Sequence, residues 1–298
     1  MIRINLLKNY NNIHIKSLSI ILFIFLFLGI LKANAAASLL ITPEEVVQGE
    51  PVLIQISGAK ISDIKKLTFN KQNLNIFTYQ NKPSALLGID LRGKSGDYTI
   101  RLDLKNGSST EKILTVKDRE KYEVAMEVPE SLGGNSSANQ TKVVNTLAQE
   151  NASLAALKTF AKSLWTNKFI YPISGPIVIT DEYGYSRLTG AYTLAHKGVD
   201  LKAKEDTKVV AMNRGIVRVA KTFQIYGKTV VIDHGYGVMT FYLHLSKIKV
   251  NVGELVQQGQ LIGLSGNTGY VIGPHLHLSV RINNISIDPI KFLDLFTR

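Results

Sequence analysis

The sequence predicts a mainly β protein in which two groups of strands are separated by a helical connector. Three observations predict this class. Short alternating stretches bounded by turn residues fill residues 38–118, an apolar series at helical spacing follows residue 133, and glycine-punctuated short stretches resume after residue 169. With 298 residues, of which 45% are hydrophobic and 19% charged, the chain has material for about two globular domains, and a disordered or collagen-like chain is excluded.

Residues 1–35 are expected to be a secretory signal peptide. The apolar run 18–31 lies between Lys16 and Lys32, and it is shorter than the roughly 20 residues of a membrane-spanning helix. Ala33-Asn34-Ala35 supplies an Ala-x-Ala site, so we expect cleavage before Ala36; an uncleaved anchor is the alternative. The remaining chain is then exported to the periplasm, the cell-wall space or the exterior, with no stable membrane anchor.

The charge balance and the absence of cysteine limit which partners and which kinds of active site are expected. The chain has 35 basic and 23 acidic residues, and the leader holds four of the basic ones, so the exported part keeps 31 against 23, or +8. This surplus favours anionic wall polymers as partners. No stripe of interleaved aromatic and basic residues is present, so nucleic acid is not expected. Without cysteine there is no disulfide, thiol nucleophile or thiolate ligand, and any metal must be held by histidine and carboxylate.

Residues 36–118 predict a small β-sandwich. Residues 52–56 form an apolar strand, and residues 98–104 alternate between apolar and polar side chains, as expected of a half-buried strand. Asn106-Gly107 then predicts a hairpin turn. The region contains no histidine, so we interpret it as a spacer, a wall-binding module or a lid.

Residues 119–168 predict a helical connector. The stretch Gly133–Ser137 is a flexible break, and Trp165, the only tryptophan, lies near the end of the connector. Apolar residues at helical spacing are predicted to share one face: Val143, Leu147, Leu154, Leu157, Ala161 and Leu164.

The candidate chemistry lies in residues 169–298, which contain five of the six histidines: His196, His234, His244, His275 and His277. His196 and Asp200 are four residues apart, which would be about 13 Å along a straight strand. They can share a metal ion only if the chain bends at Lys197-Gly198. His275 and His277 alternate on a strand, so both imidazoles face the same side.

The spacing leaves several roles open. Two histidines and a carboxylate are a common ligand set for a catalytic zinc, but either His275 or His277 could be the second histidine. His244 could be a ligand, a base or a core residue. His234 ends an apolar strand and is expected to be structural.

Several motifs resemble the lysostaphin-like zinc metalloendopeptidases, which cut peptidoglycan peptides. They are His196-x-x-x-Asp200, Asp233-His234-Gly235, Tyr242-Leu243-His244-Leu245 and Gly273-Pro274-His275-Leu276-His277, within the last 120 or so residues. The sandwich also resembles, more weakly, the immunoglobulin-like domain that precedes this peptidase in some secreted proteins. The chain departs from the family at Leu278-Ser279, where an aromatic residue and Glu are usual, and this affects groove shape rather than the ligands.

The resemblance implies a mainly β fold with a lysostaphin-like antiparallel β-sheet peptidase domain over 169–298. It implies one zinc ion held by His196, Asp200 and His277, with His244 and His275 as catalytic partners. Tyr185 and Arg187 are candidate substrate-binding residues, and a salt bridge is the alternative for Arg187. The expected function is a secreted zinc endopeptidase that hydrolyses peptidoglycan stems or cross-bridges. The alternative is a non-catalytic or latent wall-binding protein that regulates another hydrolase.

Overall fold

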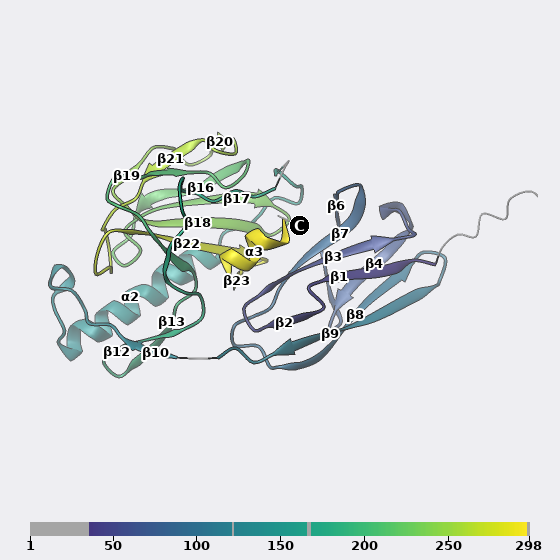
Figure 1. Cartoon of the computed structure of the whole chain (residues 1–298), viewed down its shortest axis with the longest axis horizontal. Coiled ribbons are helices and arrows are strands. Elements are labelled where there is room, and N and C mark those ends of the chain that lie inside the picture. Colours follow the sequence, from purple (N-terminus) through teal and green to yellow (C-terminus); the bar gives the residue numbers. More distant parts are fainter. Residues whose placement is uncertain (1–35, 121, 166–167, 297–298) are drawn as a thin grey trace, which may run out of the picture. The chain divides into compact units, whose positions relative to one another are not determined.

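A computed structural model describes residues 36–120, 122–165 and 168–296 of the chain (Figure 1). The expected signal peptide lies outside the described residues. Residues from Ala37 onward form one compact unit. Among the helices that the structure describes, none is both long and apolar enough to cross a membrane.

The N-terminal strands form two sheets that share one core, as expected for a sandwich. The first sheet has the order β1 (Ser38–Thr42), β3 (Pro51–Ser57), β7 (Lys82–Gly88), β6 (Phe77–Tyr79). The second has the order β2 (Glu45–Val47), β9 (Ser109–Lys117), β8 (Gly96–Leu104), β4 (Ile64–Phe69), β5 (Gln72–Asn73). Ile54 of the first sheet and Leu102 of the second belong to the same buried cluster. The hairpin predicted at Asn106-Gly107 is confirmed, because β8 and β9 pair antiparallel around it and Gly107 has a φ of 89°.

The connector contains one helix that is shorter than predicted. After β10 (Glu123–Ala125) and a 3-10 turn at Glu130–Leu132, α2 runs from Ser137 to Ala155, with Ser136 accepting a hydrogen bond from the Asn139 amide as its cap. Leu157, Ala161 and Leu164 therefore lie beyond the helix, and their assignment to its face was wrong. The cause is tertiary: Thr159 and the Phe160 amide bond the Asp233 carboxylate, at 2.6 and 3.0 Å, which draws the chain onto the sheet.

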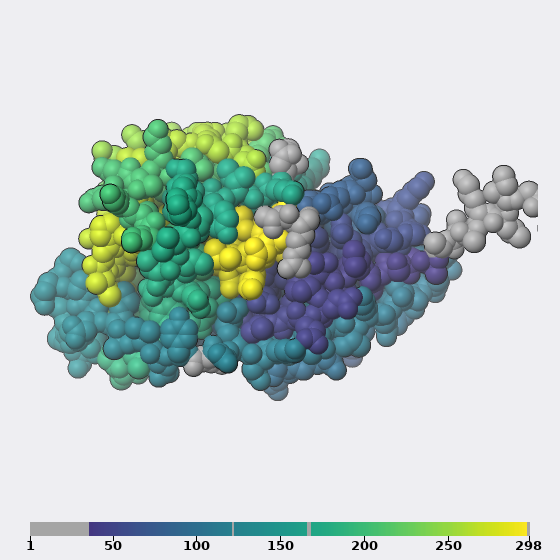
Figure 2. Space-filling view, in the orientation of Figure 1, coloured from purple at the N-terminus to yellow at the C-terminus, as the bar shows by residue number. Residues whose placement is uncertain are grey.

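The C-terminal region is built on a large antiparallel sheet, so the mainly β prediction is confirmed. Its order is β11 (Ile179–Asp181), β14 (Val199–Lys202), β22 (His275–Ile282), β18 (Val238–Leu245), β17 (Lys228–Gly235), β16 (Gly215–Thr222), β20 (Leu255–Val256), with β23 (Ile285–Ile287) beside β22. A small sheet holds β15 (Lys208–Val210), β21 (Leu261–Leu264) and β19 (Lys247–Ile248), and another joins β10 to β12 (Ser186–Thr189) and β13 (Tyr192–Ala195). Residues of β20 and β21 form the upper edge of this region in Figure 2.

The two faces of the large sheet have different coverings. On one face, Leu276 and Leu278 join an apolar cluster with α3 (Pro289–Leu295), whose first amides are capped by Asp288. The same cluster includes Leu53 and Phe77 of the sandwich. On the other face, Leu154 of α2 packs against a cluster that contains Phe241 and Leu243. The histidines of β22 lie on this second face, and His277 shares a cleft with residues of α2.

Candidate metal centre and cleft

The pairing of β14 with β22 brings the first candidate residues together. Asp200 and His277 are direct partners across the two strands, so their side chains rise from the same face. His196 lies just before β14, and the chain bends at Gly198, as the spacing required. A Cβ on Gly198 would meet the ring of His277 and would lie 2.5 Å from the carbonyl oxygen of Leu278. Glycine at this position therefore allows His196 to turn back toward its two partners.

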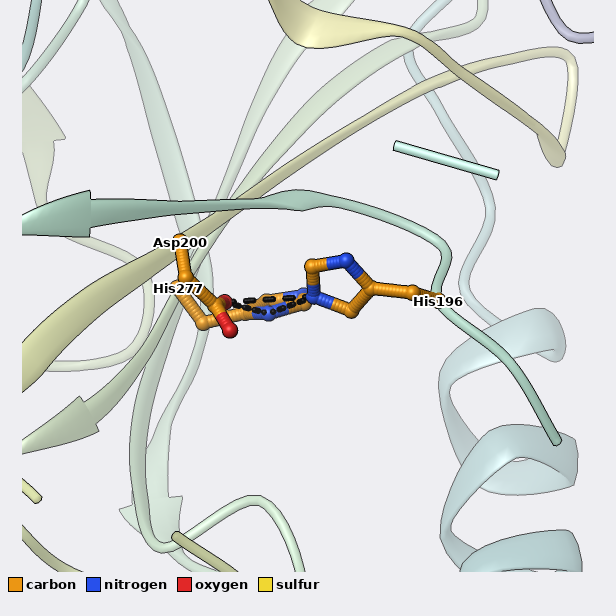
Figure 3. Close-up of side chains that lie close together, drawn as sticks. All are labelled: His196, Asp200 and His277. Atoms are coloured by element: carbon orange, nitrogen blue, oxygen red, sulfur yellow. Dashed lines mark hydrogen bonds and ion pairs between the residues drawn. The ribbon is translucent and has the colours of Figure 1, made fainter. Parts of the chain in front are cut away.

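Three ligand-type atoms converge at this point (Figure 3). His196 Nε2 lies 3.1 Å from His277 Nδ1 and 3.2 Å from Asp200 Oδ1, and His277 Nδ1 lies 2.7 Å from the same carboxylate oxygen. All three residues are buried. They form a group that could hold one metal ion.

The protonation of this group suits a cation. His196 Nδ1 lies 2.6 Å from the carbonyl oxygen of Glu182, which can only accept, so Nδ1 carries the proton and Nε2 presents a lone pair to the group. Burial lowers the pKa of His277 to about 4, so its imidazole is neutral at physiological pH. Burial by itself would raise the pKa of Asp200, but its contacts with His277 and His196 hold it well below the ordinary value. Two imidazoles and one carboxylate are a ligand set that fits a divalent ion such as zinc.

The two remaining histidines of the candidate site lie beside this group. His275 Nε2 is 3.6 Å from Asp200 Oδ1, and its ring centroid is 5.1 Å from that of His244. His275 Nδ1 bonds the carbonyl of Gly273 and His244 Nδ1 bonds the carbonyl of Thr268, both at 2.8 Å. In the neutral form of each ring, the proton therefore sits on Nδ1 and Nε2 carries the lone pair. Burial lowers the pKa of His244 well below its ordinary value, which favours the neutral form of the ring.

An irregularity in β18 aims His244 into the site. Strict alternation would place His244 on the face opposite to Leu243, whose cross-strand partner is His277. The pairing of β18 with β17 shifts between Tyr242 and Leu245, and His244 has a φ of 61°. This bulge turns its ring toward His277, with the centroids 5.8 Å apart. The sequence carries no signal for such a left-handed histidine.

Tyr185 and Arg187 lie next to the His-Asp-His group and contact two of its members directly. Arg187 Nη2 is 2.7 Å from Asp200 Oδ2, and Arg187 Nε donates to the Tyr185 hydroxyl at 2.7 Å. The Tyr185 ring is buried and lies 5.0 Å from the His196 ring. The ion pair considered as the alternative for Arg187 is present, but it is a buried pair with a candidate ligand. Substrate contact by these two residues stays a prediction.

His234 lies outside the group and fits the structural role expected for it. Its Nδ1 bonds the Arg214 carbonyl at 2.9 Å and its Nε2 bonds the Thr240 hydroxyl at 2.8 Å. Burial lowers its pKa to about 4. The ring is therefore a neutral, fully bonded member of the core.

A cleft runs from the histidines along the face of the sheet under α2. His196, His244 and His277 line it together with Leu147, Asn151 and Leu154 of the helix, and it continues past Ser279 to Arg281. Glu150 fixes α2 to this face, because its buried carboxylate accepts the amides of Gln224, Ile225 and Tyr226 at 2.7 to 3.3 Å. Sequence reasoning missed Glu150, Asn151 and Arg281. The alternation from His277 to Ser279 to Arg281 was the one signal that could have found Arg281.

The antiparallel sheet and its buried His-Asp-His group, flanked by two further imidazoles, agree with the resemblance to the lysostaphin-like metalloendopeptidases. Residues 194–289 match the model of Peptidase family M23.

Two relatives of known name are described as peptidoglycan or DD-peptide hydrolases. The chain is 34% identical over 181 residues to the peptidoglycan DD-endopeptidase ShyA of Vibrio cholerae, an alignment that covers 58% of this chain and 42% of ShyA. It is 36% identical over 114 residues to the DD-carboxypeptidase/endopeptidase Mpg of Neisseria meningitidis, covering 38% of this chain and 26% of Mpg. The chain thus spans less than half the length of these relatives. A crystal structure of a Pseudomonas aeruginosa protein assigned to peptidase M23 has the same fold, with a TM-score of 0.59 and 23% identity over 83% of this chain and 94% of the other.

Proposed function

We propose that the protein is an exported zinc endopeptidase that hydrolyses peptide bonds in peptidoglycan stems or cross-bridges. The observation that carries the proposal is the convergence of His196, Asp200 and His277, with the rings of His244 and His275 beside them. The names of ShyA and Mpg support the substrate class. Export rests on the signal-peptide pattern of residues 1–35.

Each residue of the site has a part in this reaction. His196, Asp200 and His277 would hold the zinc ion, which when bound supplies Lewis acidity and lowers the pKa of water. One of the two imidazoles, His244 or His275, accepts a proton from the attacking water through its free Nε2 and returns it to the leaving amine. The other, when protonated, stabilises the developing oxyanion. Arg187 holds the carboxylate of Asp200 in position through its bond to Oδ2.

The alternative of a non-catalytic wall-binding regulator is less well supported. A regulator has no need of two further imidazoles beside three converging ligand atoms. A net charge of +8 on the exported part still favours contact with anionic wall polymers, and such contact would hold the enzyme near its substrate.

The test is mass spectrometry of cross-linked peptidoglycan fragments after incubation with residues 36–298, with and without a chelator. We expect cuts at peptide bonds that the chelator abolishes and added zinc restores, and the fragment masses identify the bond. Fragments that stay intact at all zinc concentrations would refute the peptidase proposal.

A further inference from the structure

A group of cationic side chains lies at the end of the cleft, away from the histidines. It consists of Arg92 on the loop after β7, Lys197 between His196 and Asp200, and Arg281 on β22. These three residues and Asn151 line both the cleft and a pocket that adjoins it. We propose that this pocket binds a free carboxylate of the peptide substrate, an inference that rests on the peptidase activity proposed above.

The cations of the pocket form no ion pair with a carboxylate of the residues that the structure describes. Among the ion pairs between described residues, none includes Arg92, Lys197 or Arg281. The guanidinium of Arg281 lies 4.5 Å from the centre of the Phe241 ring and donates to the neutral amide oxygens of Asn284 and Asn151, at 3.2 and 3.5 Å. Asp90 is the one acid among the residues that line the pocket. Three positive charges against one negative charge favour an anionic ligand.

The position of the pocket suits a group carried by the substrate. Arg281 and His277 lie on the same face of β22 four residues apart, so their Cα atoms are separated by about 13 Å. An extended peptide covers that distance in about four residues. The planar fork of an arginine binds a carboxylate through two parallel hydrogen bonds. The pocket therefore matches a carboxylate within a few residues of the bond that is cut.

A free carboxylate can come from an acidic residue within the peptide or from its C-terminus, and three substrates separate these sources. The substrates are cross-linked peptides of one sequence, with all carboxylates free, with the acidic residues converted to carboxamides, or with the C-terminus amidated. kcat and KM are measured for each with zinc-loaded residues 36–298. We expect one of the amidated peptides to show a KM at least about tenfold higher, and that peptide identifies the source. Equal kcat/KM for all three would overturn the proposal.

Substitutions assign the preference to the pocket. Arg281→Gln and Arg92→Gln are expected to remove most of the discrimination by raising KM for the carboxylated peptide alone, and Arg281→Lys to retain part of it. The matched control is Lys208→Gln, which removes one charge from an exposed residue of β15 and should keep the wild-type preference. An equal loss of activity on carboxylated and amidated peptides would indicate a structural role and refute the proposal.

A substitution of Asp90 removes a negative charge from the pocket and should therefore strengthen carboxylate binding. Binding can be measured without catalysis. The Asp90 carboxylate accepts the Arg92 amide at 2.7 Å, and Asp90→Asn keeps this acceptor while removing the negative charge. Calorimetric binding of a non-cleavable carboxylated peptide should tighten in Asp90→Asn and weaken in Arg92→Gln. Unchanged binding in both variants would refute the pocket. Carboxylate-dependent binding without cleavage of any peptide would refute the peptidase proposal and leave the pocket standing.

Discussion

The sandwich and the C-terminal domain are both β structures, but they bury different kinds of side chain. The buried polar residues of the sandwich strands and their flanking turn are uncharged: Gln48, Gln55, Thr68 and Ser84. The C-terminal domain buries ionisable groups: His196, Asp200, Asp233, His234, His244, His277 and Asp288. Burying an ionisable group is costly unless it is bonded, and each histidine here has a partner. Apolar burial is sufficient for the sandwich, whereas the C-terminal core also positions chemical groups. Substitutions in the two regions should therefore differ in whether they change activity or only stability.

The largest effect is expected at Asp200, where the carboxylate contacts both histidines and Arg187. Asp200→Ala should lower kcat/KM by more than about 10³-fold and abolish stoichiometric zinc binding, because the proposed zinc site loses its carboxylate ligand. Asp200→Asn keeps the side-chain volume and should fail in the same way. The sandwich control is Asp97→Asn, at an exposed acid that accepts the Thr115 hydroxyl at 2.7 Å, and it should leave both quantities unchanged. A fully active, zinc-binding Asp200→Ala would remove the metal-site assignment.

A glycine in each region gives the second comparison. The methyl of Gly198→Ala would press on the His277 ring and the Leu278 carbonyl, so we expect about a 10²-fold loss of activity from a displaced ligand. Gly107→Ala meets no atom within 4 Å but keeps a φ of 89°, which costs about 1 kcal/mol of stability. Steady-state kinetics should therefore detect the effect of Gly198→Ala, and thermal unfolding should detect the effect of Gly107→Ala. Equal kinetics in both variants would show that Gly198 is not required for the ligand geometry.

The fold class, the hairpin at Asn106-Gly107 and the bend before Asp200 followed from the sequence, because alternation, turn chemistry and spacing are local. The end of α2 did not, because a distant carboxylate, Asp233, holds Thr159 and Phe160. The direction of His244 depends on a bulge, and the environment of Arg281 depends on Asn151, which is distant in sequence. Contacts of this kind leave no periodic trace. Local patterns therefore identified the elements and the candidate ligands, whereas tertiary contacts determine how the cleft is lined.

The pH dependence of stability should differ between the regions, since the sandwich contains no histidine. The folded-state pKa of His234, about 4, lies below the ordinary value of 6.5, so folding favours the neutral ring. The contribution of His234 to the free energy of unfolding is fully present above pH 6.5. It is lost as the pH falls toward 4, by up to about 1.4 kcal/mol per pH unit. Denaturant unfolding of His234→Gln, which keeps a donor and an acceptor, should show a shallower decrease between pH 6.5 and 5. Identical slopes would contradict a buried neutral His234.

The smallest effect is expected at Arg187, where the sequence suggested substrate contact and the structure shows a bond to Asp200. Arg187→Lys keeps the charge but loses the bond geometry shared by Asp200 and Tyr185. We expect about tenfold weaker zinc binding, a proportionate loss of kcat at limiting zinc, and an unchanged KM for the peptide. Zinc titration followed by kinetics at saturating zinc distinguishes a role in positioning Asp200 from a role in substrate binding. Unchanged zinc affinity with a higher KM would assign Arg187 to the substrate, and the carboxylate of Asp200 would then need no partner to hold the metal.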